Sequence, residues 1–132
     1  MIEGVLKFHE KFGLPTGDTD QLMGNLAVQE YRVKFLQEEL DELKEALASD
    51  DKVKVFDALL DLVYVAQGTA LFAGIDVQQW NCGMDAVQRC NMSKVRASSA
   101  EDSKRGSAFD VKKPDDFVGP EETLESILGL ID

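Results

Sequence analysis

Apolar residues recur with helical spacing along most of this chain. A first pattern covers residues 1–13 and ends at Gly13. A second runs from about residue 22 to 47, and Asp18 or Thr19 is expected to cap its start. It carries one continuous apolar stripe of leucines three or four residues apart: Leu36, Leu40, Leu43 and Leu47.

A third pattern, over residues 52–73, is apolar almost all round and predicts the central, most buried helix. A polar residue of segment 49–51 is expected to cap this helix, and Gly74 to end it. Asp76 is expected to cap a further helix over residues 77–94, whose inward stripe has four members: Trp80, Met84, Val87 and Asn91.

The composition changes after residue 95, where small and polar residues replace the helical pattern. Residues 96–120 are expected to form an extended arm, and one short helix is expected over residues 121–130 after Pro120. Only residues 108–111 resemble a strand. The chain therefore predicts an all-α bundle of three long helices with short terminal helices, in one domain with a helical core (1–95) and a C-terminal arm (96–132).

Composition narrows the classes of function. A net charge of −11 argues against a sequence-independent nucleic-acid binder, which needs a basic face. Asp57 and Asp61 interrupt the longest apolar run, so no membrane helix is predicted. The N-terminal residues lack the basic and apolar regions of a signal peptide, and we expect a cytoplasmic protein.

The two cysteines, Cys82 and Cys90, are expected to remain free thiols. They stand eight residues apart on one predicted helix, which separates them by about 12 Å along the helix axis. A disulfide needs Cα atoms within about 7 Å, so the two cannot pair within one chain.

Carboxylates gather beside the apolar stripes of the two central helices. On the first helix a stripe borders the leucines, and Glu38 lies just outside it; the members of the stripe are Arg32, Phe35, Glu39 and Glu42. On the second helix another stripe has the same spacing: Asp57, Asp61, Tyr64 and Gly68. If the helices pack antiparallel, four or five carboxylates come together.

Asp61 is the carboxylate that most needs an explanation. It lies a full turn inside an apolar helix, and burying an unpaired carboxylate costs several kcal/mol. It is therefore either ion-paired, with Arg32 as one partner, or bound to a metal. By contrast, Glu38 suits a solvated helix face, and Asp57 suits the exposed start of its helix.

The ligand types select the metal. The cluster offers only hard oxygen donors, which favour Mg²⁺, with Mn²⁺ as the alternative, over zinc or copper. The only histidine is His9, in the first short helix. A di-iron bundle site with Glu-x-x-His pairs and a Ser/His/Asp triad are therefore both poor interpretations.

Candidate phosphate-binding side chains occur in the last third of the chain. Asn91 and Lys94 continue the inward stripe of the third long helix, where a lysine either reaches water or contacts phosphate. Lys112 and Lys113 precede Pro114 and by themselves indicate only a polar loop.

Taken in order, these motifs resemble a known family. Glu38-Glu39-x-x-Glu42, followed on the next helix by Asp61-Leu62-Val63-Tyr64, is similar to the all-α nucleoside triphosphate pyrophosphohydrolases. These comprise MazG-like proteins and their phosphoribosyl-ATP pyrophosphohydrolase relatives. Residues 89–94 (RCNMSK) and 112–117 (KKPDDF) look like one subgroup, so the resemblance covers nearly the whole chain.

Two positions depart from the family's pattern. The second motif is usually Glu-x-x-Asp, but Ala58 stands three residues before Asp61, and Asp57 is the candidate replacement ligand. The Asp-Gly-Lys that often follows the third helix is Asp102-Ser103-Lys104 here.

The resemblance implies Mg²⁺-dependent hydrolysis of a (deoxy)nucleoside triphosphate between its α and β phosphates, yielding the monophosphate and pyrophosphate. Glu39, Glu42 and Asp61 would hold the metal, with Glu38 as a further ligand or as the base. It also implies a homodimer or homotetramer. Substrate contacts would come from six residues: Arg32, Tyr64, Asn91, Lys94, Lys112 and Lys113.

Two alternatives remain open at this point. Phosphoribosyl-ATP hydrolysis has the same chemistry and differs only in substrate. An acidic helical interaction module, the non-enzymatic alternative, predicts no thermal shift with Mg²⁺ and no functional loss when Asp61 becomes Asn.

Overall fold

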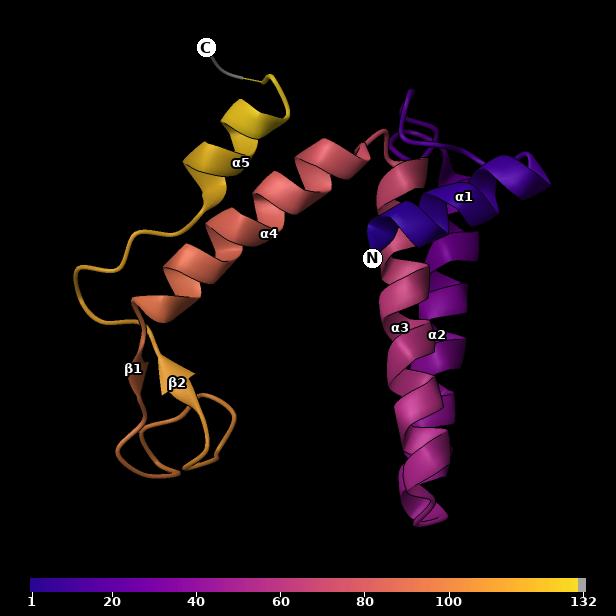
Figure 1. Cartoon of the computed structure of the whole chain (residues 1–132). Helices are drawn as coiled ribbons and strands as arrows, with labels where there is room; N and C mark the ends of the chain where they lie inside the picture. Colours follow the sequence, from indigo (N-terminus) through magenta and orange to yellow (C-terminus); the bar gives the residue numbers. More distant parts are fainter. Residues whose placement is uncertain (131–132) are drawn as a thin grey trace. The chain divides into compact units, whose positions relative to one another are not determined.

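The computed structural model describes residues 1–130 and consists mainly of helices (Figure 1). The predicted all-α class is confirmed. The one addition is a short antiparallel pair of strands, β1 and β2. In chain order the elements are α1 (Ile2–Phe12), α2 (Leu26–Ala48), α3 (Lys52–Phe72), α4 (Val77–Met92), β1 (Val95–Arg96), β2 (Val111–Lys112) and α5 (Glu121–Ile127).

Most helix ends follow from local chemistry. Gly13 ends α1 in the left-handed conformation, at φ +67°. The Asp51 carboxylate caps α3 by accepting hydrogen bonds from the backbone N–H groups of Val53 and Lys54, at 3.0 and 3.2 Å. Asp76 Oδ1 caps α4 in the same way, at 2.8 Å from the Gln79 nitrogen. These predicted boundaries are confirmed.

The predicted start of α2 is wrong. The helix begins at Leu26, and its cap is Asn25 rather than Asp18 or Thr19. The Asp20 carboxylate explains the delay, because it accepts hydrogen bonds from the backbone N–H groups two and three residues ahead, both at 2.9 Å. These bonds close a turn that competes with helix formation.

The chain divides into two compact units, one from Met1 to Trp80 and one from Asn81 onward. In the first unit, α2 and α3 lie side by side and antiparallel, and α1 packs across α3 (Figure 1). Ile2 and Val5 of α1 meet Leu71 of α3 in the fully buried core of this unit. The proposed single domain stays a prediction.

The buried residues of α2 lie on a different face of the helix from the predicted leucine stripe. Its buried residues are Arg32, Glu39 and Ala46, seven residues apart, whereas Leu40 and Leu47 are 38% and 60% exposed. A seven-residue repeat keeps one face of a helix against a long antiparallel neighbour. The face of α2 toward α3 therefore carries a cation and a carboxylate as well as hydrocarbon.

Only the C-terminal half of α3 is buried as predicted. Val65 and the segment from Gln67 to Phe72, apart from the half-buried Thr69, lie in the interior. The N-terminal half is covered on the α2 side alone and exposes five large apolar residues: Val53, Phe56, Leu59, Leu60 and Val63. The expectation of a wholly buried central helix is wrong for this half.

By length and composition, α3 is also the one helix within residues 1–130 that is suited to crossing a membrane, despite Asp57 and Asp61. The absence of a membrane helix, expected from those two residues, is therefore not borne out by this test. Core helices of globular proteins pass the same test, and the finding is weak evidence. The absence of a membrane partner stays a prediction.

A buried cation joins the elements of the first unit. Arg32 donates hydrogen bonds to Thr69 Oγ1 at 3.0 Å and to the Val65 carbonyl at 2.9 Å. Its guanidinium lies 4.6 Å from the Phe72 ring centre. His9, also buried, donates from Nδ1 to the Pro15 carbonyl. Burial lowers the pKa of Arg32.

Gly68 makes room for these two side chains, and Gly68→Ala is expected to destabilise the fold by about 1–3 kcal/mol. A Cβ there would lie 3.0 Å from both an Arg32 guanidinium nitrogen and His9 Nε2. Urea unfolding measures the effect. Gly4→Ala is the matched control: nothing lies within 4 Å of its Cβ position in α1, so it should stabilise by about 0.5–1 kcal/mol. Equal stabilities of the two variants would contradict the prediction.

The second unit contains most of α4, the strand pair and α5. Val95 pairs with Lys112 and Arg96 with Val111. A bond from the Ala97 nitrogen to the Asp110 carbonyl, 2.9 Å long, extends the pairing. Cys82 and Cys90 are free thiols, as predicted.

Candidate functional site

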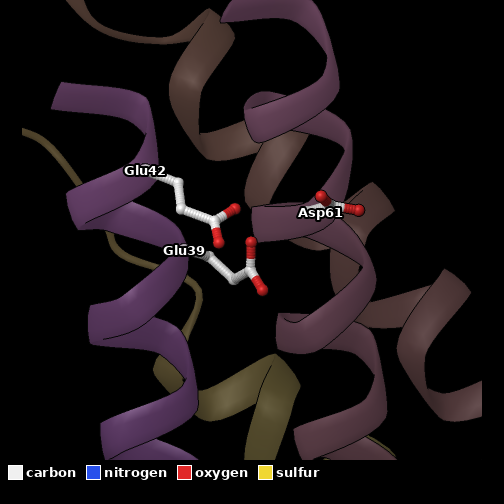
Figure 2. A group of neighbouring side chains, drawn as sticks. All are labelled: Glu39, Glu42 and Asp61. Carbon is white, nitrogen blue, oxygen red and sulfur yellow. The ribbon is translucent and has the colours of Figure 1, made fainter. Parts of the chain in front are cut away.

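Three carboxylates meet between α2 and α3 (Figure 2). Glu39, Glu42 and Asp61 each offer one oxygen, and these oxygens all lie within 4.8 Å of one another. Glu39 is buried, Asp61 is half-buried and Glu42 is exposed. Figure 2 shows the two glutamates extending from α2 toward the turn of α3 that carries Asp61. The cluster therefore has a buried side and a side open to solvent.

Helical spacing produces this arrangement. Glu39 belongs to the buried stripe of α2, and Glu42 stands three residues later, on the same side of the helix. On α3, Asp61 lies one turn after the buried Ala58 and one turn before the buried Val65, so it borders the packed face. Antiparallel packing of two such helices brings the carboxylates to the same level.

The electrostatics of the cluster are unfavourable without a cation. Burial, followed by the charges of Glu42 and Asp61, raises the pKa of Glu39. Glu39 Oε2 is buried and has no hydrogen-bond partner. No ion pair in the described part of the chain includes any of the three carboxylates. A buried oxygen left unsatisfied among negative charges costs several kcal/mol.

This donor set fits a hard divalent cation. Carboxylate oxygens are the ligands that Mg²⁺ and Mn²⁺ prefer, and the unsatisfied Glu39 oxygen is an acceptor aimed into the cluster. Arg32, the alternative partner for Asp61, donates instead to Thr69 Oγ1 and to the Val65 carbonyl. No ion pair joins Arg32 and Asp61 within residues 1–130.

The other expected ligands lie outside this group. Asp57 is exposed and is not among the grouped oxygens. It lines a neighbouring hollow of about 390 Å³ together with Glu42, Lys54 and Ala58. Glu38 is exposed, yet its charge contributes to the raised pKa of Glu39, so it lies near the cluster. Ligand roles for Asp57 and Glu38 stay predictions.

The two candidate substrate-binding residues of the first unit, Arg32 and Tyr64, differ in how exposed they are to solvent. Arg32 is 4% exposed and engaged in packing. Tyr64 is 41% exposed and meets the Phe8 ring edge-on, at 5.6 Å between centres. Tyr64 can therefore reach a ligand from solvent, whereas Arg32 serves α2–α3 packing in this structure. Both substrate roles stay predictions.

The remaining candidates lie in the second unit. Asn91 is exposed in the last turn of α4. Lys94 and Lys113 both approach the ring of Phe117. Lys112 forms an ion pair with Asp102 at 2.7 Å. Phe117 and Asp102 were not predicted to contact these lysines, because the contacts join residues that are distant in the sequence.

Comparison with known proteins identifies a family for this chain. The family model for phosphoribosyl-ATP pyrophosphohydrolase (PRA-PH) matches residues 5–89. This range includes the three grouped carboxylates and ends before Asn91 and Lys94. No curated protein matches the chain.

Proposed function

The chain belongs to the phosphoribosyl-ATP pyrophosphohydrolase family, within the MazG-like superfamily, and from that premise we propose a reaction. The protein hydrolyses (deoxy)nucleoside triphosphates between the α and β phosphates with Mg²⁺, yielding the monophosphate and pyrophosphate. Family membership supports nucleotide pyrophosphohydrolase activity. The dependence on Mg²⁺ and the choice of substrate are what we propose beyond it.

One observation carries the proposal. The buried Glu39 oxygen without a partner, grouped with Glu42 and Asp61, is an arrangement that a divalent cation would stabilise. A surface used only for solubility does not need a buried carboxylate between two packed helices. The burial of Glu39 therefore favours a metal-dependent enzyme over an acidic interaction module.

The residues divide the chemistry among them. Glu39, Glu42 and Asp61 would hold Mg²⁺ or Mn²⁺ from the packed side, leaving the solvent side, next to the exposed Glu42, for substrate. The bound ion would neutralise the phosphates and lower the pKa of water. Glu38, exposed beside Glu39, would accept the proton from the attacking water.

A substrate panel tests the reaction. The protein is incubated with Mg²⁺ and each deoxynucleoside triphosphate, ribonucleoside triphosphate or phosphoribosyl-ATP, and pyrophosphate and monophosphate are measured. Release of pyrophosphate supports the proposal. Release of single phosphates, or no turnover with any nucleotide, contradicts it.

Phosphoribosyl-ATP is the second candidate substrate, and the description of the matching family favours it. It carries the same triphosphate, so the same carboxylates serve both reactions. The kcat/KM values from the panel separate the two. Preference for phosphoribosyl-ATP over every simple triphosphate would replace the first candidate.

Metal affinity is expected to fall as the pH is lowered. The raised pKa of Glu39 means that this carboxyl takes up its proton at a higher pH than an exposed glutamate. A cation must displace that proton, so affinity should fall about tenfold per pH unit below the Glu39 pKa. Calorimetric titration with Mn²⁺ at several pH values measures this, and an affinity independent of pH would contradict it.

We also propose that the protein is a homo-oligomer. The five large apolar residues exposed on the N-terminal half of α3 form a hydrocarbon surface that α2 leaves uncovered. Asp57 and Asp61 stand on the same half of the helix and would be costly in lipid. A second copy of the chain would cover these apolar residues and leave the two carboxylates in contact with water. It therefore suits this surface better than a membrane does.

A further inference from the structure

The contact between α2 and α3 beside the carboxylate cluster is made largely by small and charged side chains. The buried residues of α2 are Arg32, Glu39 and Ala46. Ala46 and the buried Ala58 of α3 line the same hollow, so alanines from the two helices meet there. Alanines let two helices approach closely but interdigitate little. Apolar packing alone therefore does little to fix how far α2 is rotated or shifted along α3.

Arg32 fixes this contact at two points of α3. Its Nε donates to Thr69 Oγ1 at 3.0 Å, and its Nη2 donates to the Val65 carbonyl at 2.9 Å. Thr69 Oγ1 in turn donates to the same carbonyl at 2.8 Å. The three residues thus form a closed ring of hydrogen bonds across the two helices. Because a guanidinium is planar, its two donors keep a fixed orientation toward each other.

Neighbouring rings hold the guanidinium in place. Its central carbon lies 4.6 Å from the centre of the Phe72 ring, and 5.2 and 5.3 Å from those of Tyr31 and Phe35. Gly68 leaves room for it, since a Cβ there would lie 3.0 Å from a guanidinium nitrogen. A buried cation that lost its acceptors would be left unsatisfied, which is costly. The bonds of Arg32 therefore favour one position of α2 on α3.

Helical spacing carries this position to the carboxylate cluster. Glu39 stands seven residues after Arg32, about 10.5 Å along α2, and Asp61 stands eight residues before Thr69, about 12 Å along α3. Because the helices are antiparallel, both steps run in the same direction. The contact of Arg32 with Thr69 therefore sets Glu39 at the level of Asp61. A shift of one residue, about 1.5 Å, is large beside Mg²⁺–oxygen bonds of about 2.1 Å.

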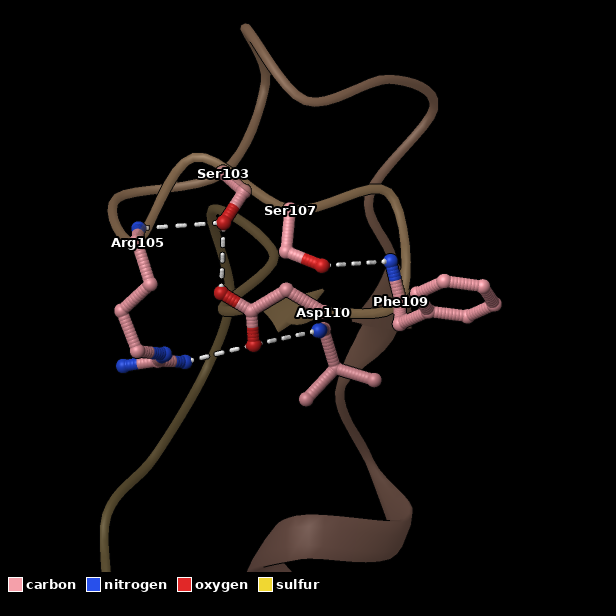
Figure 3. A network of polar contacts seen from close by, with 6 residues as sticks. Ser103, Arg105, Ser107, Phe109 and Asp110 are labelled. Atoms are coloured by element: carbon pink, nitrogen blue, oxygen red, sulfur yellow. Dashed lines mark hydrogen bonds and ion pairs between the residues drawn. The ribbon is translucent and has the colours of Figure 1, made fainter. Parts of the chain in front are cut away.

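An arginine of the second unit has comparable bonds but a different setting (Figure 3). Arg105 donates to Asp110 at 2.6 Å, and its side chain is 71% exposed. Ser103 Oγ donates to Asp110 at 2.7 Å and accepts from the Arg105 backbone nitrogen at 3.0 Å. All three residues lie in the loop between β1 and β2, so these bonds shape one loop and join no helices. Arg105 is therefore a suitable arginine for comparison.

We propose that Arg32 is a positioning residue for the metal site: through Thr69 and Val65 it sets α2 so that Glu39 and Asp61 face the same cation. Arg32 forms no ion pair with the cluster in the described part of the chain, so its effect passes through helix packing. The inference rests on the proposed function in taking the cluster as a divalent-cation site. A purely structural Arg32 would change stability and leave metal affinity as it is.

The test measures Mn²⁺ binding to the full chain by calorimetry, without nucleotide. Arg32→Met keeps a long unbranched side chain, loses both donors, and is expected to weaken Mn²⁺ binding about tenfold. Arg32→Lys keeps the charge but not the planar pair of donors, and should fall between Arg32→Met and the unchanged chain. Thr69→Val keeps the side-chain shape, removes one acceptor, and should weaken binding about threefold. It carries the test if Arg32→Met does not fold.

Two controls separate positioning from stability. Arg105→Met makes the same chemical change at the exposed arginine and should bind Mn²⁺ as the unchanged chain does. Val5→Ala removes hydrocarbon from the core that Val5 shares with Leu71, ten residues beyond Asp61 on α3. It should lower the melting temperature and leave Mn²⁺ affinity as it is. All titrations are made at a temperature where circular dichroism shows every variant folded.

The outcomes distinguish this role from the proposed reaction. If Glu39→Gln weakens Mn²⁺ binding while Arg32→Met and Thr69→Val do not, or if Val5→Ala weakens it as much as they do, the positioning role is wrong. Mn²⁺ binding that Glu39→Gln leaves unchanged would overturn the metal site and the positioning role together. If Arg32→Met and Glu39→Gln both weaken Mn²⁺ binding but the unchanged chain hydrolyses no nucleotide, the positioning role stands and the proposed reaction fails.

Discussion

Glu39→Gln is expected to lower the rate of pyrophosphate release by about 10³-fold and to raise the thermal stability of the metal-free protein. The amide keeps the shape of the side chain but cannot offer the charged oxygen that a divalent cation requires. The same loss should remove the thermal shift produced by Mg²⁺. Steady-state assays and thermal unfolding, with Mg²⁺ and with EDTA, measure both effects.

The direction of the stability change follows from the raised pKa of Glu39. When the pKa of a carboxyl is higher in the folded state than in the unfolded state, the carboxyl contributes to the stability of the fold. This contribution is complete at pH values below the pKa of the unfolded state. This contribution is lost as the pH rises through the folded value. Above the unfolded pKa of a glutamate, the Glu39 carboxyl therefore destabilises the metal-free protein, and glutamine removes this cost. In acid, where Glu39 is protonated, the two proteins should have similar stabilities.

Glu30→Gln is the matched control for this experiment. It makes the same chemical change on the same helix, at an exposed position outside the cluster. It should leave turnover, the Mg²⁺ shift and the metal-free stability as they are. Full activity of Glu39→Gln, or a lower stability in EDTA at neutral pH, would show that Glu39 is not the central ligand.

The double variant Phe56→Asp, Leu60→Asp is expected to weaken self-association by about 10³-fold, because each carboxylate replaces an apolar side chain at the proposed contact. Phe56 and Leu60 are 62% and 53% exposed on α3, so a folded single chain should tolerate the change. Sedimentation velocity over a range of concentrations measures the association constant, and circular dichroism confirms that the helices remain.

Met23→Asp is the control, because Met23 is 71% exposed in the turn before α2 and away from the apolar half of α3. It should associate as the unchanged chain does. A monomeric unchanged chain would contradict the proposed oligomer. Flotation with liposomes that disappears in the double variant would instead assign this face of α3 to a membrane.

Local sequence chemistry was sufficient for much of the fold. Gly13, Asp51 and Asp76 set helix ends through bonds to neighbouring backbone groups, which need no tertiary information. The start of α2 was mispredicted because two local arrangements compete there, and the turn closed by Asp20 prevails over an earlier helix start. Strand pairing between Val95 and Lys112 joins residues too distant for a local pattern.

The site shows the same division. Helical spacing alone grouped Glu39 with Glu42 and singled out Asp61, and the structure brings the oxygens of these three together. Sequence alone could not separate Lys112 from Lys113, since the choice depends on which face of the strand pair carries Asp102. It also could not show that Arg32 is engaged with Thr69 and Val65 rather than with Asp61.

By itself, then, the sequence determined the helical class, most helix boundaries and the residue types of a hard-metal site, because these depend on spacing and chemistry within a few turns. Only the tertiary structure decided which stripe of α2 is buried, and with it that Glu39, rather than Asp61, is the most buried carboxylate. Burial depends on which face of one helix meets its neighbour. A pattern along one helix ranks its faces by hydrophobicity but does not specify how a second helix packs on them.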